Sequence, residues 1–171
     1  MLEQEQEEYR KKELLNDLKF ASKDIIISLR ETVWALKREK YNSEDCMVRI
    51  RNFTQSLARY YTRITFSNEG EAPFGLELSY KKALHLVRIV QESVTNSIKH
   101  GNPSKITIYS YITDNRWTLK IEDNGTGFEI DNPTTENGNG LANMVSRAAT
   151  SGFELNILSD IGKGTQVIIT I

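Results

Sequence analysis

Residues 116–127 read RWTLKIEDNGTG, and this stretch indicates both a strand and a binding site at its end. Alternate residues in its first half are apolar, which is the period of a strand that buries one face. These residues are Trp117, Leu119 and Ile121. Asp123 continues the alternation, so its carboxylate is predicted to point toward the core, where an unpartnered charge is costly. Because Gly125 and Gly127 then allow close approach to the backbone, we predict a strand end that holds a ligand with a hydrogen-bond donor.

The segments around this strand predict a sheet covered by helices. Strands are expected at 105–113, 116–122, 153–159 and 164–171, with a shorter β-type run at 62–67. Asp114-Asn115 is typical of a tight hairpin turn. Helices are expected from a cap at Ser79 to a stop signal at Gly101 and Pro103, and again at 141–151. This order predicts an α+β fold, a two-layer α/β sandwich with a mixed, mostly antiparallel sheet covered by helices on one face.

The N-terminal third is predicted to be helical. Residues 3–39 lack Gly and Pro, and they carry a stripe with 3–4 spacing: Leu15, Leu18, Ser22, Ile25, Leu29, Val33 and Leu36. Such a helix packs in a bundle or a dimer, so a homodimer through this helix is one of two alternatives, and the monomer is the other. Asn42 is predicted to cap a second helix. We place a boundary near Thr62, which gives a helical segment at 1–61 and an α/β domain at 62–171.

Composition narrows the class of protein. The net charge of the 171 residues is −1, which argues against a protein that coats nucleic acid or an anionic membrane. Cys46 is the only cysteine, so a reducing compartment is expected. No apolar run reaches the roughly 20 residues of a membrane span. We therefore expect a soluble intracellular polypeptide without membrane contact of its own, which could be a piece of something larger.

The helix after Ser79 carries a polar stripe on one face: His85, Arg88, Glu92, Asn96 and Lys99. A solvated face is the simplest interpretation of such a stripe. However, Leu84, Leu86 and Ile89 make the rest of the helix apolar nearly all round, which is typical of a buried helix. The stripe is therefore predicted to face a cavity, where Glu, Asn and Lys together can orient a water, ligate Mg²⁺ and neutralise phosphate.

Two glycine-containing segments complete the set of candidate motifs. Residues 138–141, Gly-Asn-Gly-Leu, open a helix, and a helix N-terminus with free N–H groups attracts anions. Residues 162–165, Gly-Lys-Gly-Thr, superficially resemble a phosphate-binding P-loop, but the glycine spacing and the flanking strands do not fit that motif. A hairpin turn is the alternative interpretation of residues 162–165.

Taken together, the four segments resemble the N, G1, G2 and G3 boxes of the GHKL-type ATPases, which include gyrase, Hsp90, histidine kinases and MutL. The matching residues are Glu92-x-x-x-Asn96-x-x-Lys99-His100, Asp123–Phe128, Gly138–Met144 and Gly162–Thr165, in that order. Within this superfamily the sequence is most similar to sensor histidine kinases of the nitrate-sensor and DesK class. That similarity rests on Arg88–Asn96, on Gly140–Met144 and on Thr32–Leu36.

The resemblance implies an ATP site with an adenine end. Asp123 would accept a hydrogen bond from the adenine amino group, and Thr165 would support it. Gly125 and Gly127 would let the base and the ribose approach.

At the other end of the implied site, Asn96 would ligate a Mg²⁺ ion that bridges the phosphates, and Lys99 and His100 would contact phosphate or ribose oxygens. Glu92 aligns with the catalytic base of other branches. Further phosphate contacts would come from Gly138, Gly140 and the helix N-terminus at Leu141.

The phosphoacceptor histidine of this class does not match any residue here, because 1–79 contain no histidine and the two in the chain are His85 and His100. The resemblance thus implies an ATP-dependent histidine kinase domain that transfers the γ-phosphoryl to a histidine helix outside these residues, for relay to a response regulator. It also implies a cytoplasmic location, either as a soluble protein or as the cytoplasmic part of a membrane-anchored sensor. Two alternatives stay open: a serine kinase of the anti-sigma type, and a non-catalytic ATP-binding dimerisation or scaffold module.

Overall fold

The computed structural model describes residues 7–8, 10–11, 14–15, 18, 22, 25–26, 29–30, 32–129 and 140–171. The chain divides into two compact units, Met1–Glu39 and Lys40–Ile171. In the first unit the described residues up to Ala35 are helical, as expected. Apart from Trp34 and Ala35, the described apolar side chains between Leu14 and Leu36 are 49–68% exposed. Within the described parts of the chain, no helix is long and apolar enough to cross a membrane.

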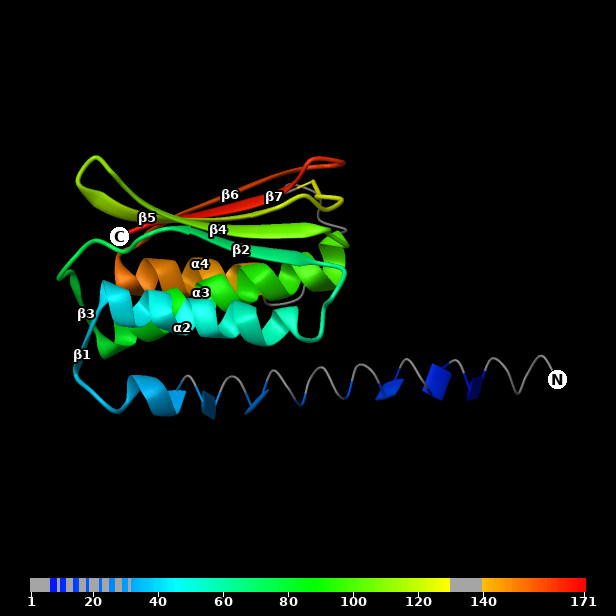
Figure 1. Cartoon of the computed structure of the whole chain (residues 1–171), viewed down its shortest axis with the longest axis horizontal. Coiled ribbons are helices and arrows are strands. Elements are labelled where there is room, and N and C mark those ends of the chain that lie inside the picture. The colour runs from blue at the N-terminus through cyan, green and yellow to red at the C-terminus, as the bar shows by residue number, and fades with distance from the viewer. Residues whose placement is uncertain are drawn as a thin grey trace. The chain divides into compact units, whose positions relative to one another are not determined.

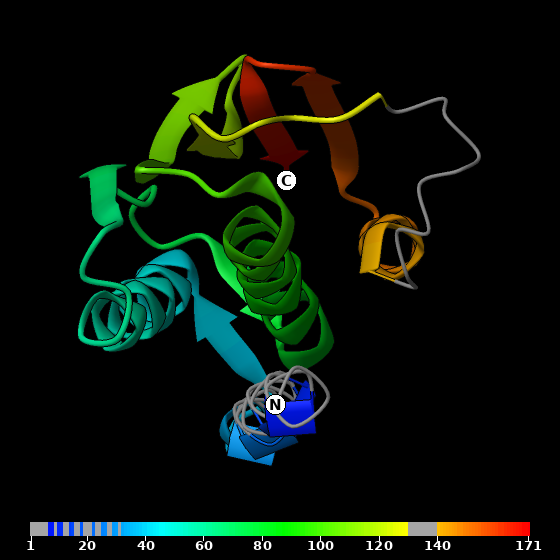
Figure 2. The ribbon, with the colours of Figure 1, turned by 90° about the vertical axis from the view of Figure 1, so that its right-hand side faces the viewer.

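The second unit is a sheet with helices on one face (Figures 1 and 2). Its elements are β1 (Lys40–Asn42), α2 (Ser43–Ala58), β2 (Thr65–Gly70), β3 (Glu77–Ser79), α3 (Tyr80–Asn96), the π-helix η1 (Ser97–Gly101), β4 (Lys105–Thr113), β5 (Arg116–Asp123), α4 (Gly140–Ser151), β6 (Glu154–Asp160) and β7 (Gly164–Thr170). The five-stranded sheet has the order β2-β4-β5-β7-β6. Only the β2–β4 pair is parallel, so the predicted mixed, mostly antiparallel α+β fold is confirmed.

Local sequence signals explain several element ends. The Asn42 side chain accepts the Asp45 N–H at 2.7 Å, while the Asp45 carboxylate accepts the Asn42 N–H at 3.3 Å, which forms a capping box at the start of α2. Ser79 caps α3 by accepting the Lys82 N–H. Asp114 and Asn115 both have positive φ, 51° and 60°, as a type I′ hairpin between β4 and β5 requires.

Other features differ from the expectations. The helix ends at Gly101, within the predicted stop signal, but its last residues form the π-helix η1, and Asn102 rather than glycine takes the left-handed conformation, with φ of 45°. Asparagine tolerates that region because its short polar side chain can bond locally. The β-type run expected at 62–67 is β2 at 65–70, where it forms the parallel edge of the sheet. The small β1–β3 ribbon had no signal in the sequence.

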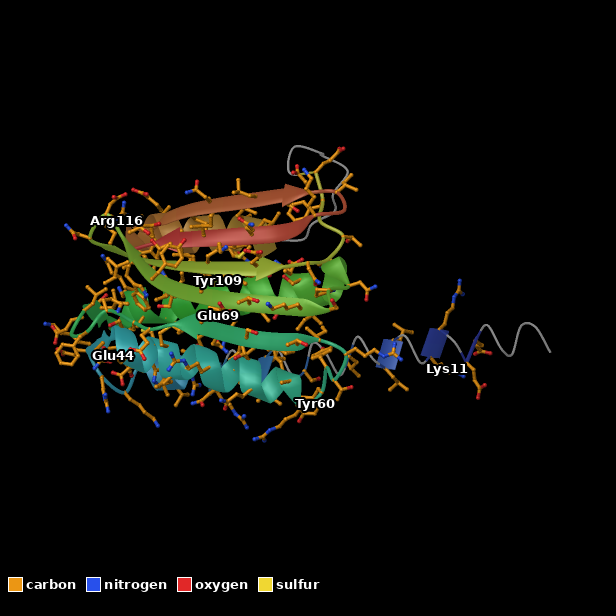
Figure 3. All side chains as sticks on the ribbon, turned by 45° about the horizontal axis from the view of Figure 1, so that its top comes forward. Lys11, Glu44, Tyr60, Glu69, Tyr109 and Arg116 are labelled. Carbon is orange, nitrogen blue, oxygen red and sulfur yellow. The ribbon has the colours of Figure 1, made fainter. Side chains whose placement is uncertain are left out.

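The core lies between the sheet and the helices, and its largest buried side chain is Trp117 on β5. The Trp117 indole N–H donates to the Ser110 hydroxyl at 2.9 Å, and that hydroxyl donates to the Glu71 carbonyl at 2.8 Å. On the other face of the sheet, Nζ of Lys120 lies 4.3 Å from the centre of the Tyr109 ring, and Arg116 pairs with Glu154 at 2.6 Å. Tyr109 and Arg116 are labelled in Figure 3. The outer face is therefore mostly polar, and the core residues point toward the helices.

Candidate functional site

Asp123 ends β5 with its side chain among core residues, as its position in the alternation predicts. It is 4% exposed, and Trp117, Leu119 and Ile121 before it are equally buried. The Ser97 hydroxyl donates to Oδ2 of Asp123 at 2.6 Å, and the Gly125 N–H donates to Oδ1 at 2.8 Å. Each carboxylate oxygen thus has one donor, which offsets part of the cost of burial and leaves lone pairs for a ligand.

A cavity of about 300 Å³ opens beside Asp123. It is lined by the end of α3, by η1, by the loop after β5, by the start of α4 and by β6 and β7. The lining residues are Glu92, Ser93, Asn96, Ser97, Lys99, His100, Gly101, Asp123, Gly127, Phe128, Gly140, Leu141, Met144, Ile157, Thr165 and Val167. Its volume is at the lower end of the range of small-molecule sites, roughly 300–1,000 Å³.

The polar stripe of α3 divides between this cavity and other contacts. Glu92 and Asn96 line it as half-buried side chains, whereas Lys99 and His100 on η1 are more exposed. His85, two turns earlier, instead bonds the Ser151 hydroxyl at the end of α4, with 2.8 Å between Nδ1 and Oγ. The part of the polar stripe that carries Glu92, Asn96 and Lys99 therefore faces the cavity, as the sequence predicts.

The glycines of the motifs serve different purposes. Gly140 opens α4 directly against Glu92, because a Cβ at position 140 would overlap the Glu92 carboxylate. Gly125 is not among the lining residues; a Cβ there would overlap the Gly101 carbonyl, so its small size lets the loop pack against η1. Gly127 lines the cavity with φ of 61°. Gly138 lies outside the described residues.

Hydrogen bonds fasten the loop after β5 on both sides. The Thr126 N–H donates to the Gly101 carbonyl at 2.8 Å, and the Gly162 N–H donates to the Thr126 carbonyl at 2.6 Å. Gly162 belongs to the β6–β7 turn, so residues 162–165 form a hairpin and not a P-loop. Thr165, the first residue after that turn to reach the cavity, is paired across the strands with Asp123.

Sequence reasoning missed part of the wall of the cavity. Its apolar part consists of Phe128, Leu141, Met144, Ile157 and Val167. Ile157 on β6 and Val167 on β7 lie outside the motif segments and carry no local signal beyond ordinary core periodicity. Ser97 was also missed, although its place one turn after Ser93 and directly after Asn96 could have suggested a position on the inner face.

The described residues of the cavity wall offer few protein ligands for a metal ion. Among the described residues, no three His, Cys, Asp or Glu side chains gather as a metal site. Glu92 and Asn96 still offer oxygen ligands within the cavity. Mg²⁺ commonly takes one or two protein ligands and completes its shell with waters and phosphate oxygens.

Residues 81–171, more than half of the chain, match the family described as histidine kinase-, DNA gyrase B- and HSP90-like ATPases, so the chain belongs to that family. It is 39% identical over 83 residues to the sensor protein VraS of Staphylococcus aureus (strain COL), which is 48% of this chain. It is 38% identical over 87 residues, 51% of this chain, to the sensor histidine kinase LiaS of Bacillus subtilis (strain 168). Each match spans only 24% of the relative's length.

Solved structures share the fold. The histidine kinase AdeS of Acinetobacter baumannii aligns with a TM-score of 0.61 at 18% identity, over 94% of this chain and 82% of that one. The catalytic domain of histidine kinase ThkA aligns with a TM-score of 0.60 at 17% identity, over 77% of this chain and 94% of that one. The α+β architecture is thus that of histidine kinase catalytic domains.

Proposed function

We propose that this chain is the ATP-binding catalytic part of a two-component sensor histidine kinase, which binds Mg-ATP and donates the γ-phosphoryl to a histidine. The observation that carries the proposal is the buried Asp123 carboxylate, held by two donors at the wall of the cavity. An ionised carboxylate only accepts hydrogen bonds, so it suits the amino group of adenine. Family membership and the similarity to sensor kinases support the same assignment.

The remaining side chains suit the phosphate end of the proposed site. Asn96 offers an amide oxygen to Mg²⁺. Lys99 and His100 on η1 are exposed at the cavity, where they can contact phosphate or ribose oxygens. Gly140 and Leu141 place the N–H groups at the start of α4 at the cavity, and these favour anions. Glu92 is the proposed proton acceptor or orienting group at this end. Phosphoryl transfer depends mainly on such positioning and charge neutralisation.

The proposed reaction breaks the bond between the γ-phosphorus and the bridging oxygen, and forms a phosphorus–nitrogen bond to the imidazole, with ADP as the leaving group. The acceptor histidine lies on a helix that residues 1–79 do not supply. We propose that residues 1–61 belong to a dimerisation region plus a connecting helix, that residues 62–171 carry the ATP site, and that a response regulator receives the phosphoryl group. The proposed compartment is the cytoplasm.

Two measurements test this function. Calorimetry with ATP and MgCl₂ should show binding at one site per chain, and absence of binding to any adenine nucleotide would contradict the proposal. Labelled ATP is then incubated with the chain and a separate acceptor-helix fragment, where acid-labile label on the fragment is expected. Acid-stable label would instead indicate a serine kinase of the anti-sigma type, and binding without transfer would indicate a scaffold module.

A further inference from the structure

Two buried serines lie one turn apart where α3 becomes the π-helix η1. The Ser93 hydroxyl donates to the Ile89 carbonyl at 2.8 Å, which is an ordinary contact within a helix. The Ser97 hydroxyl has two acceptors, the Ser93 carbonyl at 3.1 Å and Oδ2 of Asp123 at 2.6 Å. A hydroxyl carries one proton, and the shorter contact to a charged oxygen is the stronger of the two. The proton of Ser97 therefore points at Asp123.

We infer that Ser97 is a positioning residue for nucleotide binding, which acts by fixing the carboxylate of Asp123. This inference rests on the proposed function. The terminal torsion of an aspartate is broad, so one hydrogen bond does not fix the plane of the carboxylate. The Gly125 N–H reaches Oδ1 from the loop, and Ser97 reaches Oδ2 from the helix. Two donors on two oxygens hold the plane, and the ligand meets a prearranged acceptor.

The position of Ser97 in the chain also predicts which part of the ligand is affected when its hydroxyl is removed. Ser97 directly follows Asn96, which is at the proposed phosphate end, but its hydroxyl bonds the residue at the proposed adenine end. Loss of the hydroxyl should therefore weaken every ligand that contains the base by the same factor. A disturbed phosphate end would instead weaken ATP with Mg²⁺ and leave adenosine unaffected.

The test compares Ser97→Ala with the wild-type chain, using adenosine, ADP, and ATP with Mg²⁺ as ligands in calorimetry or competition. Ser97→Ala is expected to raise the dissociation constant of all three by a similar factor, roughly fivefold to thirtyfold, which corresponds to about 1–2 kcal/mol. Ser110→Ala is the matched control, because Ser110 is also buried with two hydrogen bonds but lies outside the cavity lining. It should lower stability and leave nucleotide affinity unchanged.

A double-mutant cycle separates positioning from a general structural effect. In an Asp123→Asn background, Ser97→Ala should cause little further loss of affinity, because its partner has already been changed. Fully additive losses, or a wild-type affinity in Ser97→Ala, would overturn the inference. If Ser97→Ala does not fold, Ser97→Cys carries the test, because a thiol is a weaker donor; an unchanged affinity there overturns it as well. A wild-type chain that binds no nucleotide would instead refute the proposed function.

Discussion

Oε1 of Glu92 fills the space that a side chain at position 140 would need, so α3 and the first residue of α4 meet at one point of the cavity wall. The Cβ of an alanine at 140 would also lie 3.3 Å from Nδ2 of Asn96. The two residues that we propose for the phosphate end are thus arranged around a glycine.

Gly140→Ala is expected to keep the fold and impair function. The Glu92 carboxylate ends a flexible side chain and can move aside, and replacing Gly by Ala at a compatible backbone position often adds roughly 0.4–1 kcal/mol of stability. Displacement of Glu92 should slow phosphoryl transfer by roughly 10- to 100-fold, the scale for a misplaced reacting group. Thermal unfolding and a transfer assay measure the two effects. In a Glu92→Ala background, Gly140→Ala should cause no further decrease in the rate of phosphoryl transfer. A Gly140→Ala variant that transfers phosphoryl at the wild-type rate would contradict the proposed role of the contact between Glu92 and position 140.

Asp123→Asn is expected to weaken ATP binding by about 1–3 kcal/mol without unfolding the domain, because the amide keeps the shape but changes the hydrogen-bonding character. Calorimetry measures the affinity, and circular dichroism checks the fold. Asp114→Asn is a matched control at the exposed β4–β5 turn, where asparagine is equally suited to a positive φ. Equal affinities of Asp123→Asn and the wild type would refute the adenine assignment.

His85 is expected to make stability depend on pH. Burial, together with the positive charge of Arg147, holds the pKa of His85 below its ordinary value. The unfolded chain therefore binds the proton more readily, so the stabilisation is complete above about pH 6.5 and is lost as the pH falls through the lower folded-state pKa. Urea unfolding from about pH 8 to about pH 5 should show this decline, and His85→Asn should flatten it. An identical slope in both proteins would exclude His85 as its source.

Cys46 is expected to report on unfolding. It is fully buried on α2, and burial raises the pKa of its thiol to about 12. Because the thiolate is the reactive form, a thiol reagent should not modify the native protein on the timescale of its reaction with the denatured chain. Since the chain has one cysteine, the label count is unambiguous, and Cys46→Ala provides the blank. Rapid labelling under native conditions would show that α2 opens readily.

Several features of the fold could be predicted because their causes are local. The caps at Asn42 and Ser79 bond to backbone N–H groups three residues on, and the Asp114-Asn115 turn depends on the conformations of those two residues alone. The inward direction of Asp123 follows from strand parity. Such signals act over a few residues, so a single sequence carries them.

Other features depend on residues that are far apart in the sequence. Examples are the parallel pairing of β2 with β4 and the pairing of β1 with β3. The sequence of each strand alone does not indicate which other strand it pairs with. Gly125 looked like a position for ligand approach, but its small size is needed against the Gly101 carbonyl. The local pattern predicted the stop near Gly101 but not the π-helix η1 that precedes it.

The sequence by itself determined that a carboxylate would lie on the buried face at a strand end. It also determined that a polar stripe would interrupt an otherwise apolar helix, and that glycines would follow the strand and the helix. It could do so because alternation, helical spacing and turn chemistry are properties of neighbouring residues. Only the tertiary structure decided that Ser97 donates to Asp123 and that Glu92 lies against Gly140. Those contacts join residues 26 and 48 positions apart, and packing of the helices on the sheet brings them together.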